Sequence, residues 1–244
     1  MSRPVILSSL TYIDARYLLL KLNFAKTIHF LTFDVSEKFF NEPLTKIMPT
    51  FAYPIGNSLY LNVTNRCSNE CSFCIKFNSR TFLENELFLD TEPSFDDVMA
   101  AIAEFSDFDE VVFCGYGESL LRLDLVRQVA EAIKQRYCTC VRINTDGQAN
   151  LVYGRNIIPE LAGIVDCISV SLNAHDAATY MRLCHSPFGE AGFAGVCDFI
   201  RLATAEIPEV IASIVRLPSL DVDACKALAL SLGASFRVRS YYKE

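Results

Sequence analysis

The sequence lacks several features that would assign it to particular classes of protein. It has no run of about 18 uninterrupted apolar residues, so we expect no membrane-spanning helix, although 51% of its 244 residues are hydrophobic. Gly and Pro are few, at 10 and 9 residues, which excludes a collagen-like or low-complexity chain. The N-terminus shows no charged segment followed by an apolar run and a small-residue cleavage site. We therefore expect an intracellular protein of the cytoplasm.

An excess of positive charge is also missing. The chain has 22 Lys and Arg against 29 Asp and Glu, for a net charge of −7, so direct binding to nucleic acid is not expected. Histidine is scarce as well. The three His residues stand alone without the spacing of metal ligands, and we assign them no role.

Alternating short apolar runs and segments of helical period fill the chain from residue 58 onward. The apolar runs predict six strands, at Leu59–Val63, Glu110–Cys114, Thr139–Asn144, Asp166–Leu172, Val210–Leu217 and Phe236–Arg239. Helices are expected between them, at 95–105, 125–137, 176–183, 192–205 and 221–232. Strands that alternate with helices imply an α/β fold with a parallel sheet. The pattern leaves open a partial barrel or a doubly wound sheet, because six units are too few for an eight-unit barrel.

Local signals mark the ends of some of these helices and the start of the repeating pattern. Ser94 followed by Asp97 predicts a capping box, and Gly233 predicts a helix stop. Turn residues around Pro54 precede the first predicted strand, and no recognisable chemistry lies before them. We therefore expect an N-terminal extension over residues 1–54 and one domain over residues 55–244.

Three of the ten Cys residues lie within eight positions, as Cys67, Cys71 and Cys74. This CxxxCxxC spacing directly follows the first predicted strand, and three thiolates so close together can hold one metal cluster. A structural zinc site needs four protein ligands, and ferredoxins supply four Cys with different spacing. An iron–sulfur cluster held by three Cys leaves one iron open, while a zinc site completed from elsewhere in the chain is the alternative.

The other seven Cys are scattered through the rest of the sequence. We interpret them as small buried hydrophobic residues. As the alternative, ligands of an auxiliary cluster would come from Cys184, Cys197 and Cys225, which lack close CxxC pairs.

The Cys motif, with Phe73 before its last Cys, resembles the signature of radical S-adenosylmethionine (radical SAM) enzymes. Four flanking blocks resemble the TatD-associated radical SAM family: residues 59–67, 111–118, 142–150 and 236–243. Two positions depart from that family, Ser119 where Pro is usual and Asp146 where Asn is usual. The resemblance implies an incomplete (β/α)6 barrel of parallel strands, the partial TIM barrel of radical SAM proteins. It also implies a [4Fe-4S] cluster on Cys67, Cys71 and Cys74, with S-adenosylmethionine on the open iron.

The predicted cofactor-binding residues follow from this resemblance and from their position at the carboxyl ends of the predicted strands. They are Phe73, Gly115, Tyr116, Gly117, Glu118, Asn144, Ser171, Asn173 and Arg216. Gly115 and Gly117 would allow close approach to the backbone, and Glu118 would face the ammonium of the cofactor or, alternatively, cap a helix. The Asn and Ser residues would bind its ribose and carboxylate; alternatively, backbone groups satisfy them.

Arginines gather at the ends of the predicted strands in an otherwise acidic chain. Arg142, Arg216, Arg237 and Arg239 would hold an anionic substrate or the cofactor carboxylate, or would pair with nearby acidic residues.

The activity that the resemblance implies is reductive cleavage of S-adenosylmethionine to a 5′-deoxyadenosyl radical, which abstracts hydrogen from an unidentified substrate. Reduced ferredoxin or flavodoxin would supply the electron, and a functional link to a TatD-family nuclease is expected. The alternatives are an activating enzyme of the glycyl-radical type, which acts on a partner protein, and a non-enzymatic Fe–S or zinc-binding module.

Overall fold

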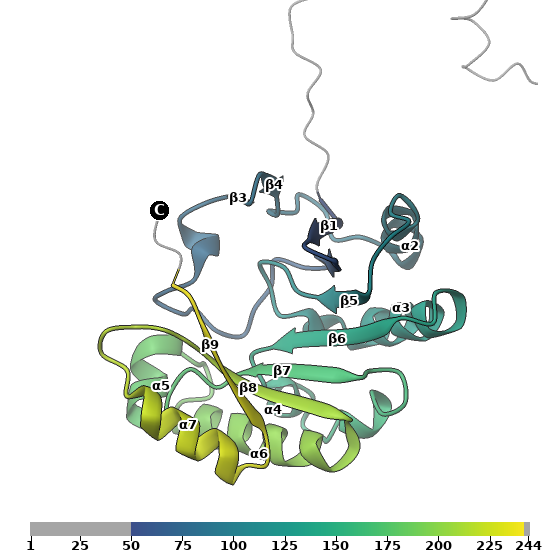
Figure 1. Cartoon of the computed structure of the whole chain (residues 1–244). Coiled ribbons are helices and arrows are strands. Elements are labelled where there is room, and N and C mark those ends of the chain that lie inside the picture. The colour runs from purple at the N-terminus through teal and green to yellow at the C-terminus, as the bar shows by residue number, and fades with distance from the viewer. Residues whose placement is uncertain (1–49, 242–244) are drawn as a thin grey trace, which may run out of the picture. The chain divides into compact units, whose positions relative to one another are not determined.

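A seven-stranded sheet forms the centre of the protein in a computed structural model that describes residues 50–241. The strand order is β1-β2-β5-β6-β7-β8-β9 (Figure 1). The strands are β1 (Ala52–Ile55), β2 (Ser58–Leu61), β5 (Glu110–Phe113), β6 (Cys140–Thr145), β7 (Cys167–Ser171), β8 (Glu209–Val215) and β9 (Ser235–Arg239). All neighbours from β2 to β9 are parallel, which confirms the predicted α/β fold. Because β1 and β9 are both edge strands of this sheet, the partial barrel is not closed.

Helices connect the parallel strands and lie against one face of the sheet (Figure 1). They are α2 (Phe95–Ala103), α3 (Leu123–Arg136), α4 (Ala149–Tyr153), α5 (Ala177–Cys184), α6 (Glu190–Glu206) and α7 (Val222–Ser231). Three short 3-10 helices are η2 (Ile75–Phe77), η3 (Ser119–Arg122) and η4 (Ile158–Glu160). The capping box predicted at Ser94 and Asp97 is present at α2, and Gly233, with φ +85°, follows α7. None of the described helices is long and apolar enough to cross a lipid bilayer.

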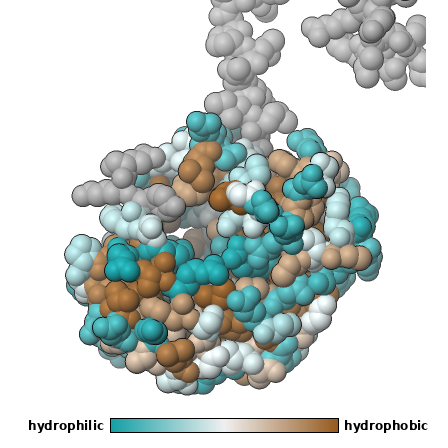
Figure 2. Space-filling model, in the orientation of Figure 1, coloured by the Kyte–Doolittle hydropathy of each residue, from teal (hydrophilic) through white to brown (hydrophobic). Residues whose placement is uncertain are grey.

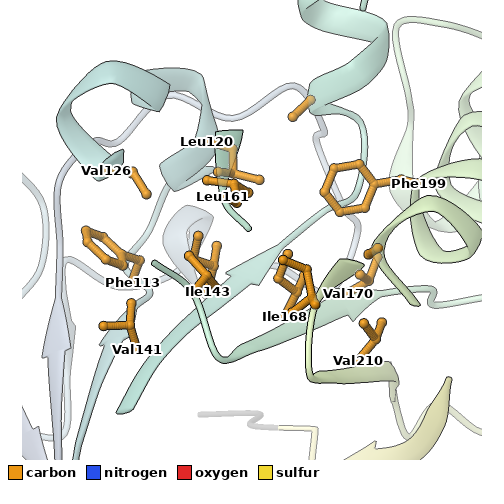
Figure 3. Close-up of a cluster of buried hydrophobic side chains, with 14 of the residues drawn as sticks. Phe113, Leu120, Val126, Val141, Ile143, Leu161, Ile168, Val170, Phe199 and Val210 are labelled. Carbon is orange, nitrogen blue, oxygen red and sulfur yellow. The ribbon is translucent and has the colours of Figure 1, made fainter. Parts of the chain in front are cut away.

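The hydrophobic core lies between the sheet and these helices (Figure 3). Alternate residues of each strand point to this side, so Phe113, Ile143 and Val170 are fully buried. They pack in one cluster with Val126 of α3 and Phe199 of α6. Each such side chain stabilises the fold by about 1.5–3 kcal/mol relative to exposure. The core therefore fixes which face of the sheet remains for other chemistry.

The strands β1, β3 and β4 were not predicted, and they form two hairpins. β1 pairs with β2 in antiparallel register through a turn at Gly56, whose φ is +58°. Pro54 lies in β1, an edge position where the missing N–H of proline is tolerated. A second hairpin joins β3 (Thr81–Phe82) to β4 (Asn85–Glu86) in the segment after the Cys motif. β1 spans the expected domain boundary at residue 54, and most of the expected extension lies outside the described residues, so that division stays a prediction.

Candidate functional site

The residues predicted to bind ligands gather along one edge of the sheet. The Cys loop, residues 67–74, follows β2, and the glycine turn, residues 115–118, follows β5. Asp146 follows β6 and Asn173 follows β7, while Arg239 ends β9. Because these strands are parallel, their carboxyl ends share one edge, where ligands bind in α/β folds.

The sheet face away from the helices carries a series of polar side chains near this edge. Asn144 of β6 lies in register with Ser169 of β7. Ser171 lies in register with Ser213 of β8, and Ser213 with Arg237 of β9. Burying such a row of polar side chains costs free energy unless water or a ligand forms hydrogen bonds with them. Figure 2 shows the surface hollowed between β9 and the segment that carries β3 and β4.

Backbone hydrogen bonds attach the Cys loop to the last turn of α5. The Glu70 amide donates to the Cys184 carbonyl at 3.1 Å, and the Ser72 amide donates to the Leu183 carbonyl at 2.9 Å. Within the loop, the Cys74 amide donates to the Cys71 carbonyl at 3.0 Å. The middle of the Cys motif is thus fixed by an element more than a hundred residues further along the chain.

A buried polar network holds Asn69, the residue at the centre of the first Cys spacing. The Gln148 side-chain amide donates to Asn69 Oδ1 at 2.6 Å, and Asn69 Nδ2 donates to the Tyr180 hydroxyl at 3.1 Å. The Ser186 hydroxyl donates to Gln148 Oε1. Gln148 and Tyr180 are completely buried. The four residues of this network were not identified from the sequence as part of the site. The position of Asn69 inside the Cys motif was the only feature of the sequence that pointed to them.

The three thiols of the Cys loop are half-buried and lie near one another, but each has a different environment. Cys67 Sγ lies 3.9 Å from Asp146 Oδ2, and the neighbouring Cys184 thiol raises the pKa of Cys71. Within residues 50–241, no three Cys, His, Asp or Glu side chains converge as a metal site. Burial raises the pKa of Cys67 and Cys74, and the nearby Cys71 raises both further. A metal that binds these thiols would therefore displace protons.

The glycine turn packs directly against the segment that leads into the Cys loop. A Cβ on Gly117 would lie 2.4 Å from the carbonyl oxygens of both Thr64 and Arg66, and a Cβ on Gly115 would lie 2.0 Å from Asn62 Oδ1. The Glu118 amide also donates to the Arg66 carbonyl at 2.7 Å. The missing side chains therefore make room for the protein's own backbone at Gly117 and for the Asn62 side chain at Gly115, and their contact with a cofactor stays a prediction.

Glu118 is buried, with 3% of its surface exposed, and its carboxylate is bound by the chain itself. One oxygen accepts from the Leu120 amide at 3.0 Å and from the Thr145 hydroxyl at 2.9 Å. The other accepts from the Asp146 amide at 2.5 Å. Glu118 thus caps η3, as the alternative expectation had it. A role opposite an ammonium group stays a prediction.

Asp146, one of the two departures from the family pattern, lies beside Glu118 and the Cys loop. It accepts hydrogen bonds from the Ser68 hydroxyl and from the Gln148 amide, the latter at 2.9 Å. Burial, and then the charge of Asp146, raises the pKa of Glu118, and burial raises the pKa of Asp146. No described ion pair includes either residue. Two buried carboxyls this close are stabilised by a shared proton or by a cation.

The predicted Asn and Ser residues lie at the same end of the sheet. Asn144 Oδ1 and Asn173 Oδ1 are buried acceptors that no hydrogen bond reaches among the described residues. The Asn173 side chain donates from Nδ2 to Cys184 Sγ at 3.8 Å, and its backbone has a φ of +56°. Arg239 donates to the Ser171 hydroxyl at 3.1 Å. Two buried acceptors without partners among the described residues, at this end of the sheet, favour a ligand that carries hydrogen-bond donors.

Phe73, Tyr116 and Arg216 are placed differently from the other predicted residues. Phe73 is half-buried against the main core, and Tyr116 is buried in a small cluster with Tyr53 and Leu87. Arg216 has an exposed side chain, and its amide donates to the Arg239 carbonyl at 2.9 Å. Their cofactor contacts therefore stay predictions.

The arginines at the strand ends separate into two kinds. Arg142 pairs with Glu110 at 2.9 Å, and its side chain is 11% exposed, so ion pairing accounts for it. Arg237 and Arg239 are exposed on the polar face of β9 and form no ion pair with any other described residue. These two remain available to an anion.

Of the scattered cysteines, Cys184, Cys197 and Cys225 are all buried. Cys197 and Cys225 belong to the hydrophobic core on α6 and α7, as expected for small buried residues. The same expectation was wrong for Cys138 and Cys140, which are exposed just before and at the start of β6. Cys184 differs from them because it contacts the Cys loop.

Residues 61–230 match the sequence profile of the Radical SAM superfamily, so the chain belongs to this superfamily. The match covers most of the sheet and the whole of the Cys loop. No curated protein matches the chain.

Solved structures share the fold at low sequence identity. A radical SAM methyltransferase from Sphaerobacter thermophilus is 14% identical with a TM-score of 0.52, over 78% of this chain and 68% of that one. SuiB from Streptococcus suis, bound to its precursor peptide SuiA, is 14% identical with a TM-score of 0.55, over 94% and 50% of the two chains. Methylornithine synthase, PylB, is 14% identical with a TM-score of 0.53, over 76% and 53%. The chain thus spans about half the length of SuiB and of PylB.

Proteins of this superfamily typically use a [4Fe-4S] cluster and S-adenosylmethionine, and the site residues fit both groups. Three thiols from one loop are a suitable donor set for an iron–sulfur cluster. The carboxyl pair of Glu118 and Asp146 suits a cationic ligand, and the free acceptors of Asn144 and Asn173 suit hydroxyl or ammonium donors.

Proposed function

We propose that this protein is a radical SAM enzyme that holds a [4Fe-4S] cluster on Cys67, Cys71 and Cys74. The cluster and S-adenosylmethionine would together supply a 5′-deoxyadenosyl radical, formed by reductive cleavage, that removes hydrogen from a substrate. The observation that carries this proposal is the superfamily match over residues 61–230, which includes three half-buried thiols at the carboxyl edge of a parallel sheet.

The chain's own residues would bind and orient the cofactor. Glu118 and Asp146 together would place negative charge opposite its ammonium or sulfonium, since both carboxyls are buried without a cation among the described residues. Asn144, Ser171 and Asn173 would bind its hydroxyl and amino groups from the polar face of the sheet. The remaining contacts would come from Phe73, Gly115, Tyr116, Gly117 and Arg216.

The substrate that this site suits carries a carboxylate or phosphate. Arg237 and Arg239 project from alternate positions of β9 onto the polar face and lack acidic partners among the described residues. A guanidinium group binds such anions with paired hydrogen bonds. Arg239 is positioned by its hydrogen bond to Ser171, which links this anion site to the proposed cofactor site.

The partners that the proposal requires are an electron donor and a reducing location. Reduced ferredoxin or flavodoxin would deliver the electron to the cluster, and the cytoplasm would keep the ten cysteines as thiols. Membership of the TatD-associated subfamily, with its link to a TatD-family nuclease, belongs to the proposal as well.

Anaerobic reconstitution tests the proposal. The full chain is loaded with iron and sulfide, reduced with dithionite and mixed with S-adenosylmethionine, and we expect a brown protein that forms 5′-deoxyadenosine. Cys71→Ala should lose both the colour and the product, whereas Cys225→Ala, in the core on α7, should retain both. A coloured protein without product would indicate an electron carrier, and a colourless zinc protein would indicate a structural module; either result refutes the enzyme.

A further inference from the structure

Cys184, which lies outside the Cys motif, is held against Cys71 by hydrogen bonds on both sides of the pair. The Glu70 amide donates to the Cys184 carbonyl, and the Ser72 amide donates to the Leu183 carbonyl. The His185 ring Nδ1 also lies 2.9 Å from the Glu70 carbonyl. The backbone segments that carry the two Cys residues therefore run side by side.

The two thiols are in contact as well. The Cys184 thiol lies near enough to Cys71 to raise the pKa of Cys71, and Asn173 Nδ2, just after β7, donates to Cys184 Sγ at 3.8 Å. Neither Cys is in a disulfide in the structure. A disulfide requires Cα atoms roughly 4.4–6.8 Å apart, and the two backbone hydrogen bonds that flank Cys71 hold the Cys184 segment directly beside it.

The exposure of the two residues differs in a way that suggests an order of reaction. Cys71 is half-buried, so a small molecule can reach it, whereas Cys184 is completely buried. An oxidant would therefore meet Cys71 first, and Cys184 would react only with a group already attached to Cys71.

We propose that Cys71 and Cys184 form a disulfide when the Cys loop holds no metal, with a small-molecule disulfide such as oxidised glutathione as the oxidant. The Cys71 sulfur attacks one glutathione sulfur, breaks the glutathione disulfide and releases one reduced glutathione. The Cys184 sulfur then attacks Cys71 Sγ and releases the second. The two protein thiols lose two electrons and two protons, and both pass to the two glutathione molecules.

This bond would remove one of the three proposed cluster ligands. Metal-free protein in the disulfide form would be unable to assemble the cluster until a thiol reductant reopens the bond. That consequence rests on the proposed function, because it takes Cys71 as a ligand. Formation of the bond does not depend on the proposed function.

Mass spectrometry of the metal-free full chain tests the proposal. After incubation with oxidised glutathione and alkylation of the remaining thiols, trypsin releases residues 67–76 and residues 183–201 as separate peptides. We expect these two peptides to be linked, with fragment ions that place the bond at Cys71 and Cys184. In Cys184→Ala, which lacks the second thiol, glutathione should remain attached to Cys71 instead. Cys225→Ala, a change at an equally buried Cys, should still give the linked peptides.

The proposal is overturned if wild-type protein carries glutathione on Cys71 as Cys184→Ala does, or if no linked peptide forms. A second measurement separates this outcome from failure of the proposed function. If reduced protein assembles no cluster but the linked peptides form, the disulfide stands and the enzyme assignment fails. If the cluster assembles and 5′-deoxyadenosine forms but no linkage forms, the enzyme assignment stands and the disulfide proposal fails.

Discussion

Replacement of Gln148 by methionine tests how the Cys loop is held in place. Gln148 is completely buried, donates to Asn69 and accepts from Ser186. Methionine has a similar length and fills the same space, so the cavity term is small. It leaves Asn69 Oδ1 and the Ser186 hydroxyl buried without their partner.

The expected cost follows from these two groups. Each buried polar group left without a partner costs about 1–3 kcal/mol, so Gln148→Met should lower the free energy of unfolding by about 2–6 kcal/mol. That is a large part of the roughly 5–15 kcal/mol of an ordinary domain. Urea unfolding of the metal-free protein, followed by circular dichroism, measures the loss as a lower midpoint at unchanged slope.

Matched variants make the measurement specific. Gln128→Met, on the exposed side of α3, should change stability by less than about 0.5 kcal/mol. Because Ser186 needs no partner once its hydroxyl is removed, Ser186→Ala combined with Gln148→Met should cost less than the sum of the single changes. If Gln148→Met is no more destabilising than Gln128→Met, the buried network does not anchor the loop.

Three further changes test other parts of the site. Gly117→Ala places a Cβ 2.4 Å from two backbone carbonyls, so we expect a loss of about 1–3 kcal/mol in urea unfolding; an unchanged midpoint would contradict the packing described for the glycine turn. Arg142→Gln leaves the partly buried Glu110 without its ion pair, and double-mutant cycles with Glu110→Gln should show a coupling of about 0.5–3 kcal/mol; additive effects would mean that the pair contributes nothing. The pKa of Asp176 is lowered by the hydrogen bond from the Thr179 amide, so its stabilisation is present above its ordinary pKa of 3.8 and is lost as the pH falls through the lower folded value. Acid titration of stability in Asp176→Asn should therefore be flatter below pH 3.8 than in the wild type, and equal slopes would refute the cap at α5.

Much of the fold could be predicted because its signals are local. The apolar runs of β5 to β9, the capping box at Ser94 and the helix stop at Gly233 depend on residues a few positions apart. The strand β1 was missed because Pro54 and Gly56 usually mark turns, whereas here Pro54 lies in β1 and Gly56 forms the turn of the hairpin to β2. Strand pairing of this kind depends on the neighbour, which the local pattern does not specify.

The candidate site shows the same division. Sequence spacing brought out the Cys motif and the polar residues at strand ends, since parallel strands put their carboxyl ends on one side. The sequence led us to expect that the glycine turn leaves space for a ligand. Only the packing shows that the carbonyl groups of Thr64 and Arg66 occupy the space beside Gly117. Asp146 could be singled out as a departure, but its contact with Ser68 across the sheet edge could not.

By itself, the amino-acid sequence determined how most strands and helices alternate along the chain and that three thiols lie in one loop. Both follow from residue types at short spacing. Tertiary structure alone decided which distant residues hold that loop. Asn69 meets Tyr180, 111 positions away, and Cys71 meets Cys184. These contacts exist because adjacent parallel strands in the sheet bring α5 and the end of β2 to the same edge, and strand order and register are properties of the folded chain.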